Sequence, residues 1–241
     1  MLRIISFALG NIWRWEKSKN RDVFIKYAKK LDIDGVELTF ASKEELFAFK
    51  LSLGNEKFLR GLKYVTIHAP FDFIGDNTTE KEQIKQLEVI SKIYKQVNAK
   101  NVVIHPHSLP SKKILNEFNL KFSTENLRKK TNITIADLKR IFKEYPKLGL
   151  CLDVSHAYSW SKYETRKLTK TFGDRITQFH FSGAYRGKDH QSLRAVSKDF
   201  FSSTEVLLKS NAPIVIEEDM RIKSEKFLKQ EVEFIKRMFS S

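Results

Sequence analysis

The chain has 241 residues, 41% of them hydrophobic, with a formal net charge of +15. This length suits one α/β barrel domain over residues 1–241, and the single cysteine, Cys151, excludes a disulfide scaffold or a cysteine-rich zinc module. The apolar N-terminal run ends before Trp13, too short for a signal peptide or a membrane span, so we expect a soluble, cytoplasmic protein without a membrane partner. The excess of Lys and Arg favours an anionic ligand, a small sugar first and DNA as the alternative.

Eight apolar runs along the chain read as strands. Several are continuously apolar, such as the VVI of the fourth run, which is typical of strands covered on both faces. In chain order the runs are Arg3–Leu9, Gly35–Thr39, Tyr64–His68, Asn101–His105, Lys121–Glu125, Gly149–Asp153, Ile176–His180 and Pro213–Glu217. Eight is the number of strands that a closed parallel barrel needs.

Segments with helical spacing separate and follow these runs. The 3.6-residue period is clearest in the third segment. The predicted helices are Asp22–Leu31, Glu44–Leu53, Glu80–Val97, Ser111–Phe118, Ile135–Tyr145, Tyr163–Phe172, Ser203–Lys209 and Lys223–Met238. The longest irregular stretch is Phe181–Lys198. Regular alternation of strand and helix predicts a single (β/α)₈ TIM barrel.

Side chains able to bind a cation stand at the ends of the last six runs. In chain order they are His68, His105, Glu125, Asp153, His180 and Glu217. The carboxyl ends of barrel strands share one face, so these groups should converge. Imidazole and carboxylate ligands together favour Zn²⁺, Mn²⁺, Fe²⁺ or Co²⁺, whereas oxygen ligands alone favour Mg²⁺ or Ca²⁺.

The positions of these six side chains, together with those of two further histidines, predict up to three metal sites. The predicted sets are Glu125, Asp153, His180 and Glu217 for one ion, His68 and His105 with a bridging Glu125 for a second, and His156 with His190 for a third. Alternatively, His156 orients the substrate. We therefore expect one to three divalent ions, Mn²⁺ or Zn²⁺ first, with Mg²⁺ or Co²⁺ as alternatives.

Ordered motifs along the chain resemble those of the xylose-isomerase-like TIM barrels, which include AP endonuclease family 2. The motifs are His68-Ala69-Pro70-Phe71, His105-Pro106, Glu125-Asn126-Leu127, Leu152-Asp153-Val154-Ser155-His156, His180, Asp189-His190 and Ile216-Glu217. They span almost the whole chain. The superfamily contains metal-dependent sugar and sugar-phosphate isomerases and epimerases, and also endonuclease IV.

The resemblance to the isomerases and epimerases implies one ion and an enediolate intermediate. Glu125 and Glu217 would then exchange protons with the substrate as general base and acid, and His156 would hold a substrate oxygen. The segment Asp34-Gly35-Val36-Glu37-Leu38 is similar to these sugar enzymes and places Glu37 on the pocket wall. This segment leads the sequence analysis to favour a sugar or sugar-phosphate isomerase or epimerase.

The resemblance to endonuclease IV implies three zinc ions and cleavage of DNA at abasic sites. Eight of that family's nine ligands have counterparts in the three sets given above. The ninth, an Asp two residues before the last histidine, is replaced by Lys188, and the neighbouring Asp189 is out of phase. A multi-zinc phosphodiesterase is therefore the alternative function, and a non-enzymatic binding protein a third class.

Several loop residues on the expected active face are candidates for binding substrate. Trp13 and Phe71 can stack on a sugar ring or a base, or else cap the barrel mouth. Arg186 and Lys188, together with neighbouring arginines, can bind a substrate phosphate.

Overall fold

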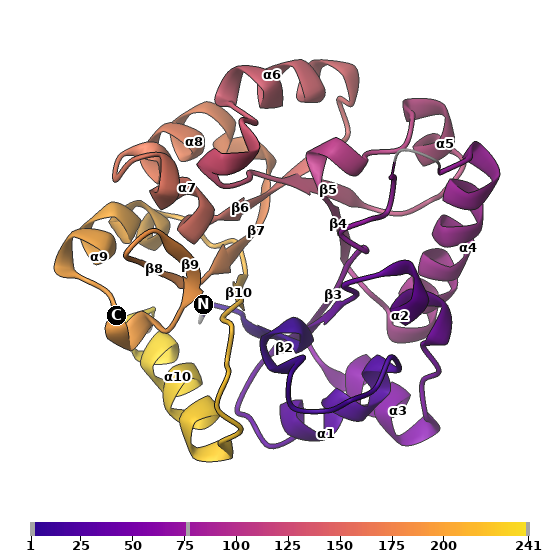
Figure 1. The fold of residues 1–241 in the computed structure, drawn as a ribbon, viewed down its shortest axis with the longest axis horizontal. Helices are drawn as coiled ribbons and strands as arrows, with labels where there is room; N and C mark the ends of the chain where they lie inside the picture. Colours follow the sequence, from indigo (N-terminus) through magenta and orange to yellow (C-terminus); the bar gives the residue numbers. More distant parts are fainter. Residues whose placement is uncertain (1–2, 76–77, 240–241) are drawn as a thin grey trace.

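The computed structural model describes residues 3–75 and 78–239. Over these ranges eight parallel strands close into a barrel in the order β1-β10-β7-β6-β5-β4-β3-β2, surrounded by helices (Figure 1). The strands are β1 Ile5–Ala8, β2 Gly35–Thr39, β3 Tyr64–His68, β4 Asn101–Ile104, β5 Phe122–Glu125, β6 Gly149–Asp153, β7 Ile176–Phe181 and β10 Ile214–Ile216. The predicted TIM barrel is confirmed.

Closure of the barrel depends on β1, which pairs with the strands on both sides of it. Phe7 is in register with Val36 of β2 and with Ile216 of β10. All three side chains are fully buried. The first and last barrel strands are therefore neighbours, and no sheet edge is left between them.

The helices pack their apolar faces against the outside of the strands. They are α1 Ile25–Ala28, α2 Lys43–Ala48, α3 Leu53–Gly61, α4 Glu80–Val97, α5 Lys112–Asn116, α6 Ile135–Glu144, α7 Val154–Trp160, α8 Glu164–Phe172, α9 Lys198–Thr204 and α10 Glu225–Met238. In α4 a capping box of Thr79 and Glu82 begins the helix, and Asn98 in the left-handed conformation ends it. In the described ranges no helix combines the length and apolar composition of a membrane span.

Three of the predicted helices differ in the structure by more than a shift of their ends. The segment Asp22–Leu31 begins as a 3-10 helix, Arg21–Phe24, and α1 covers only Ile25–Ala28. The segment Glu44–Leu53 is not one helix, because the backbone becomes extended at Phe49 and a second helix, α3, begins at Leu53. The segment Ser203–Lys209 begins earlier, as α9 from Lys198, and ends as a 3-10 helix. No pattern in the sequence predicted α7, which follows β6 directly.

The stretch predicted to be irregular contains an antiparallel hairpin above β7. Its strands are β8 Gly183–Tyr185 and β9 Lys188–Gln191. The turn between them uses positive φ angles at Arg186 (49°) and Gly187 (73°). This hairpin carries His190 to the barrel mouth.

Candidate metal centre

The described residues contain three groups of side chains with converging ligand atoms. The groups are His68, His105 and Glu125; Glu125, Asp153, His180 and Glu217; and Asp153, His156 and His190. Within each group the ligand atoms all lie within 4.8 Å of one another. The structure thus brings together the ends of six different barrel strands and the hairpin.

Glu125 lies at the centre of these groups, and its two oxygens face different partners. Its Oε2 lies 3.4 Å from Nε2 of both His68 and His105. Its Oε1 lies 3.2 Å from His156 Nδ1 and 3.5 Å from His180 Nδ1. The carboxylate can therefore bridge two ions, one on each oxygen.

The group of four has buried lone pairs that the protein itself does not satisfy. Within the described part of the chain, no hydrogen bond reaches Glu125 Oε1, Asp153 Oδ2, His180 Nδ1 or Glu217 Oε2. His180 Nδ1 and Glu217 Oε2 approach to 2.7 Å, yet without hydrogen-bond geometry. Leaving such atoms unpaired is costly, and one cation at their common centre would satisfy all of them. The mixed nitrogen and oxygen donors fit a divalent transition metal.

Local structure after β6 orients Asp153 and His156 together. Asp153 is the N-cap of α7, and its Oδ1 accepts hydrogen bonds from His156 N at 2.5 Å and from Ser155 Oγ at 2.9 Å. One oxygen is thus used by the cap, which leaves Oδ2 for a cation. The first turn of α7 places His156 beside the same site.

Asn126 ties together the two strands that carry Glu125 and Asp153. Its Nδ2 donates to Asp153 O, and its Oδ1 accepts from Asp153 N, both at 2.8 Å. The side-chain amide therefore imitates a backbone peptide and extends the β5–β6 pairing by one rung.

Backbone carbonyls fix the rings of two further histidines. Nδ1 of His68 lies 2.8 Å from Ala69 O, and Nδ1 of His190 lies 3.0 Å from Glu217 O. A carbonyl accepts only, so Nδ1 carries the proton in both rings. Nε2 is then left as a lone-pair donor, the form that binds a metal.

A carboxylate faces His156 from the hairpin. Asp189 Oδ2 lies 3.6 Å from His156 Nε2 and accepts a hydrogen bond from Arg128 Nη1 at 3.0 Å. The next residue, His190, has a left-handed backbone with φ of 52°. Asp189, out of phase in the sequence, thus lies beside the third group without being one of its three converging ligands.

The charges of the centre shift its protonation strongly. Burial raises the pKa of Glu125, but the neighbouring histidines, His180 first, hold it well below its usual range. Burial lowers the pKa of His156, but the carboxylates of Asp153 and Glu125 outweigh it and raise that pKa to about 10. Burial likewise opposes ionisation of Glu217, yet His180 brings its pKa down to about 2. A bound cation must therefore displace protons from histidines.

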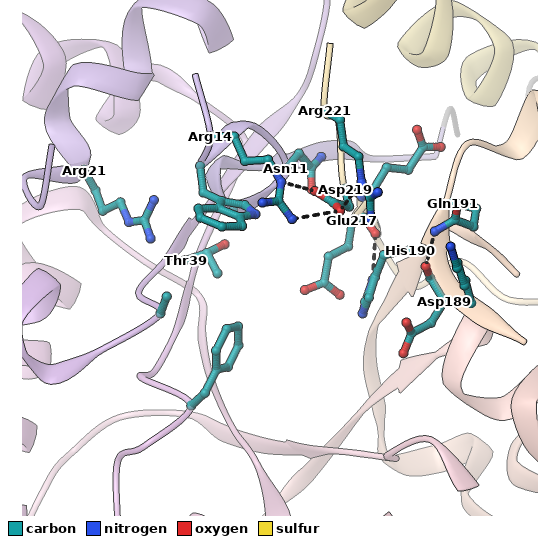
Figure 2. A pocket seen from close by; sticks show the side chains of 16 residues that line it. Asn11, Arg14, Arg21, Thr39, Asp189, His190, Gln191, Glu217, Asp219 and Arg221 are labelled. Carbon is teal, nitrogen blue, oxygen red and sulfur yellow. Dashed lines mark hydrogen bonds and ion pairs between the residues drawn. The ribbon is translucent and has the colours of Figure 1, made fainter. Parts of the chain in front are cut away.

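A cavity of about 430 Å³ opens next to the centre. Glu217 and His190 line it on one side and Arg21 on the other, as Figure 2 shows. Trp13, 48% exposed, and Phe71, 43% exposed, also face it. The space thus combines metal-binding groups, aromatic faces and charged side chains of both signs.

Comparison with known proteins identifies the family. Residues 25–238 match the family described as xylose isomerase-like TIM barrel. The chain belongs to this family. Its members are metal-dependent enzymes, epimerases and AP endonucleases among them. No curated protein gives a significant sequence match.

Solved structures from both branches of the xylose isomerase-like barrels share this fold. Endonuclease IV from Thermus thermophilus superposes with a TM-score of 0.67 at 18% identity, over 98% of this chain and 99% of that one. D-allulose 3-epimerase from Methylomonas sp., in complex with D-allulose, gives 0.69 at 14% identity, over 98% of both chains. A D-tagatose 3-epimerase-like protein gives 0.66 at 17% identity, over 98% of this chain and 99% of that one. At these identities the likeness establishes the fold.

The predicted substrate-binding residues of this xylose isomerase-like barrel divide into two sets. Trp13, Phe71 and Lys188 line the cavity. Arg186 lies at the hairpin tip with its guanidinium over Tyr185 and is not among the described cavity-lining residues. Glu37 is not on the cavity wall either, because it is fully buried against His180.

Sequence reasoning missed three residues that shape this site in the xylose isomerase-like barrel. Gln178 contacts His180, and its position two residues earlier on the same strand was an available signal, since such residues share a face. Asn126 stood in a quoted motif without a role. Arg21, 2% exposed and paired with Glu45, gave no signal in the sequence.

Proposed function

We propose that this chain is a multi-metal phosphodiesterase that cleaves nucleic acid at abasic sites, the activity that the resemblance of its sequence motifs to endonuclease IV implies, with an endonuclease IV among its structural neighbours. The observation that carries the proposal is the position of Glu125 between separate ligand groups, one oxygen facing His68 and His105 and the other facing His180. The sequence alone favours a sugar isomerase. The bridging geometry leads us to place the phosphodiesterase first.

A one-ion sugar enzyme would leave part of this arrangement unused. It needs only the group of Glu125, Asp153, His180 and Glu217. His68, 1% exposed, and His105 would then face a buried carboxylate without a task, although burying polar groups is costly. If a second ion is bound between these histidines and Glu125, both histidines serve as its ligands.

The chemistry of the proposal is hydrolysis of a phosphodiester. Divalent ions bound here would act as Lewis acids on the phosphoryl oxygens and lower the pKa of an attacking water. The water oxygen bonds to phosphorus, one phosphorus–oxygen bond breaks, and the leaving oxygen takes up a proton. Glu217, 15% exposed on the cavity wall, would hold a cation through Oε2, and its other carboxylate oxygen is left to accept the water's proton.

Other residues around the cavity suit a nucleic-acid substrate. Lys188 brings a cationic group to the lining, which also holds Arg21, ion-paired with Glu45, and four carboxylates. The chain as a whole carries +15, which attracts a phosphate backbone. Trp13 and Phe71 offer aromatic faces on which an unpaired base can stack.

A ketose epimerase is the second candidate, favoured by the group of four itself. Glu125 and Glu217 approach the same nitrogen, His180 Nδ1, at 3.5 and 2.7 Å. Two carboxylates around one ion can exchange protons with opposite faces of a ketose, with His156 holding an oxygen. The cavity of about 430 Å³ suits a small sugar.

The deciding experiment combines metal analysis with two activity assays on protein purified without chelator. Two or three zinc ions per chain and nicking of an abasic duplex support the phosphodiesterase. One ion and interconversion of ketoses with solvent deuterium uptake support the epimerase. His105→Ala should lower both zinc content and nicking. The matched variant His107→Ala, at a neighbouring exposed histidine outside the three groups, should change neither.

A further inference from the structure

Glu37 lies on β2 beneath the metal centre and is completely buried. Its Oε2 accepts hydrogen bonds from Thr66 Oγ1 at 2.9 Å and from Gln178 Nε2 at 2.8 Å. Nε2 of His180 lies 3.1 Å from its Oε1 and 3.3 Å from its Oε2. A carboxylate buried in the barrel interior needs such donors to offset the loss of hydration.

The direction of each hydrogen bond follows from Gln178. Tyr64 Oη donates to Gln178 Oε1 at 3.0 Å, so the amide nitrogen of Gln178 faces Glu37 and acts as a donor. That nitrogen also lies 3.1 Å from His180 Nε2. His180 Nε2 is hydrogen-bonded to Glu37 Oε2 at 3.3 Å, and an ionised carboxylate only accepts, so Nε2 is the N–H donor. Its 3.1 Å contact with the amide nitrogen of Gln178 is then between two donors that share this acceptor.

The other tautomer of His180, with the proton on Nδ1, does not fit the groups around either ring nitrogen. A lone pair on Nε2 would face two carboxylate oxygens of Glu37 at 3.1 and 3.3 Å. A proton on Nδ1 would occupy the point shared with Glu125 and Glu217, where the 2.7 Å approach to Glu217 Oε2 lacks hydrogen-bond geometry. The geometry around the ring selects the proton on Nε2.

We propose that Glu37 is a positioning residue that holds the His180 proton on Nε2 and so directs the Nδ1 lone pair to the cation in the group of four. The inference rests on the proposed metal centre but not on which reaction it catalyses. A hydrogen bond from the distal ring nitrogen to a carboxylate also makes the imidazole a stronger ligand. Glu37 thus acts through His180 and need not touch the substrate.

The test measures zinc binding without any substrate. Chelator competition with Zn²⁺ gives the affinity of each site, and the ion lost in His180→Ala identifies the group of four. Glu37→Gln, of equal size, should weaken that ion by roughly 10- to 100-fold. Glu231→Gln is the matched control, since Glu231 is also fully buried but contacts Ser192 and Arg194, neither of which belongs to a ligand group. It should leave the affinity unchanged.

A second measurement uses the wild-type chain, so the test does not depend on folding of the variant. Long-range ¹H–¹⁵N spectra of the Zn²⁺-loaded protein, assigned through His180→Ala, should give a protonated Nε2 and a metal-bound Nδ1 for His180. The inference fails if Nδ1 carries the proton, or if Glu37→Gln binds zinc as tightly as wild type. Absence of zinc from the wild-type chain would instead overturn the proposed function.

Discussion

Replacing Glu125 by Gln should remove two ions at once. In the wild-type chain the two oxygens of Glu125 face different ligand groups. In the variant an amide nitrogen, which cannot ligate a metal, replaces one of these oxygens. The ion between His68 and His105 and the ion in the group of four both depend on this bridge. The ion near His156 and His190 does not.

The size of the effect follows from the linkage between binding and folding. An ion present at a hundred times its Kd stabilises the folded state by about 2.7 kcal/mol. For a chain of this size each kcal/mol moves Tm by about 2–4 °C, so one ion contributes roughly 5–11 °C. Loss of two out of three equal sites should therefore remove about two thirds of the metal-dependent rise in Tm.

The assay is differential scanning calorimetry of each variant with Zn²⁺ and with chelator, paired with elemental mass spectrometry. Comparing each variant with its own metal-free form cancels any direct effect of the substitution on the fold. His105→Ala should lose one ion, and Glu231→Gln should lose none. If Glu125→Gln retains the wild-type zinc content and Tm rise, the bridging role of Glu125 is refuted.

Three further predictions concern protonation, substrate contact and packing. Because the pKa of His156 is raised to about 10, this ring is protonated at pH 7 in the metal-free chain. Zinc binding should therefore release protons and become tighter as pH rises. Titration calorimetry in buffers of different ionisation enthalpy measures this release, and equal binding heats in all buffers would contradict it. Trp13→Ala should weaken binding of an abasic duplex by about 1–3 kcal/mol in fluorescence anisotropy, and an unchanged Kd would argue against stacking. Gly35→Ala should lower the free energy of unfolding in urea by at least about 1–3 kcal/mol, because its Cβ would lie 2.0 Å from a backbone oxygen of β3. Gly54→Ala, near the start of α3 with open space around it, should instead be neutral or stabilising by up to about 1 kcal/mol, and equal losses in the two variants would disprove the steric argument.

The barrel could be predicted because its strands are buried on both faces and most of them carry apolar runs. Runs such as Gly149–Asp153 are buried along their whole length, so the pattern in the sequence is unbroken. The short helices α3 and α7 were harder to predict from the pattern of apolar residues. The first four residues of α7, from Val154 to Ala157, are all buried, which removes the one-sided pattern that marks a surface helix. In α3, Leu53 is 86% exposed and blurs the pattern in the opposite way.

The convergence of the candidate ligands could be predicted for a similar reason. A parallel barrel collects the ends of its strands, so Glu125, Asp153 and His180 needed only their positions in the sequence. The place of Asp189 could not be predicted, because it depends on the path of a hairpin with left-handed residues. The contact between Glu37 and His180 could not be predicted either, because the two residues are 143 positions apart in the sequence and meet only when the barrel is closed.

The hydrogen bonds that Asn126 adds between β5 and β6 make the geometry of the metal ligands independent of the segments that contact the substrate. The group of four is held at the ends of the strands and by this amide, whereas Trp13 and Phe71 lie in segments beyond the strand ends. Exchange or lengthening of those segments can therefore alter what enters the cavity while the metal ligands keep their spacing. One scaffold can in this way acquire new substrates over evolutionary time, and an engineer who redesigns this barrel should vary its loops and keep Asn126.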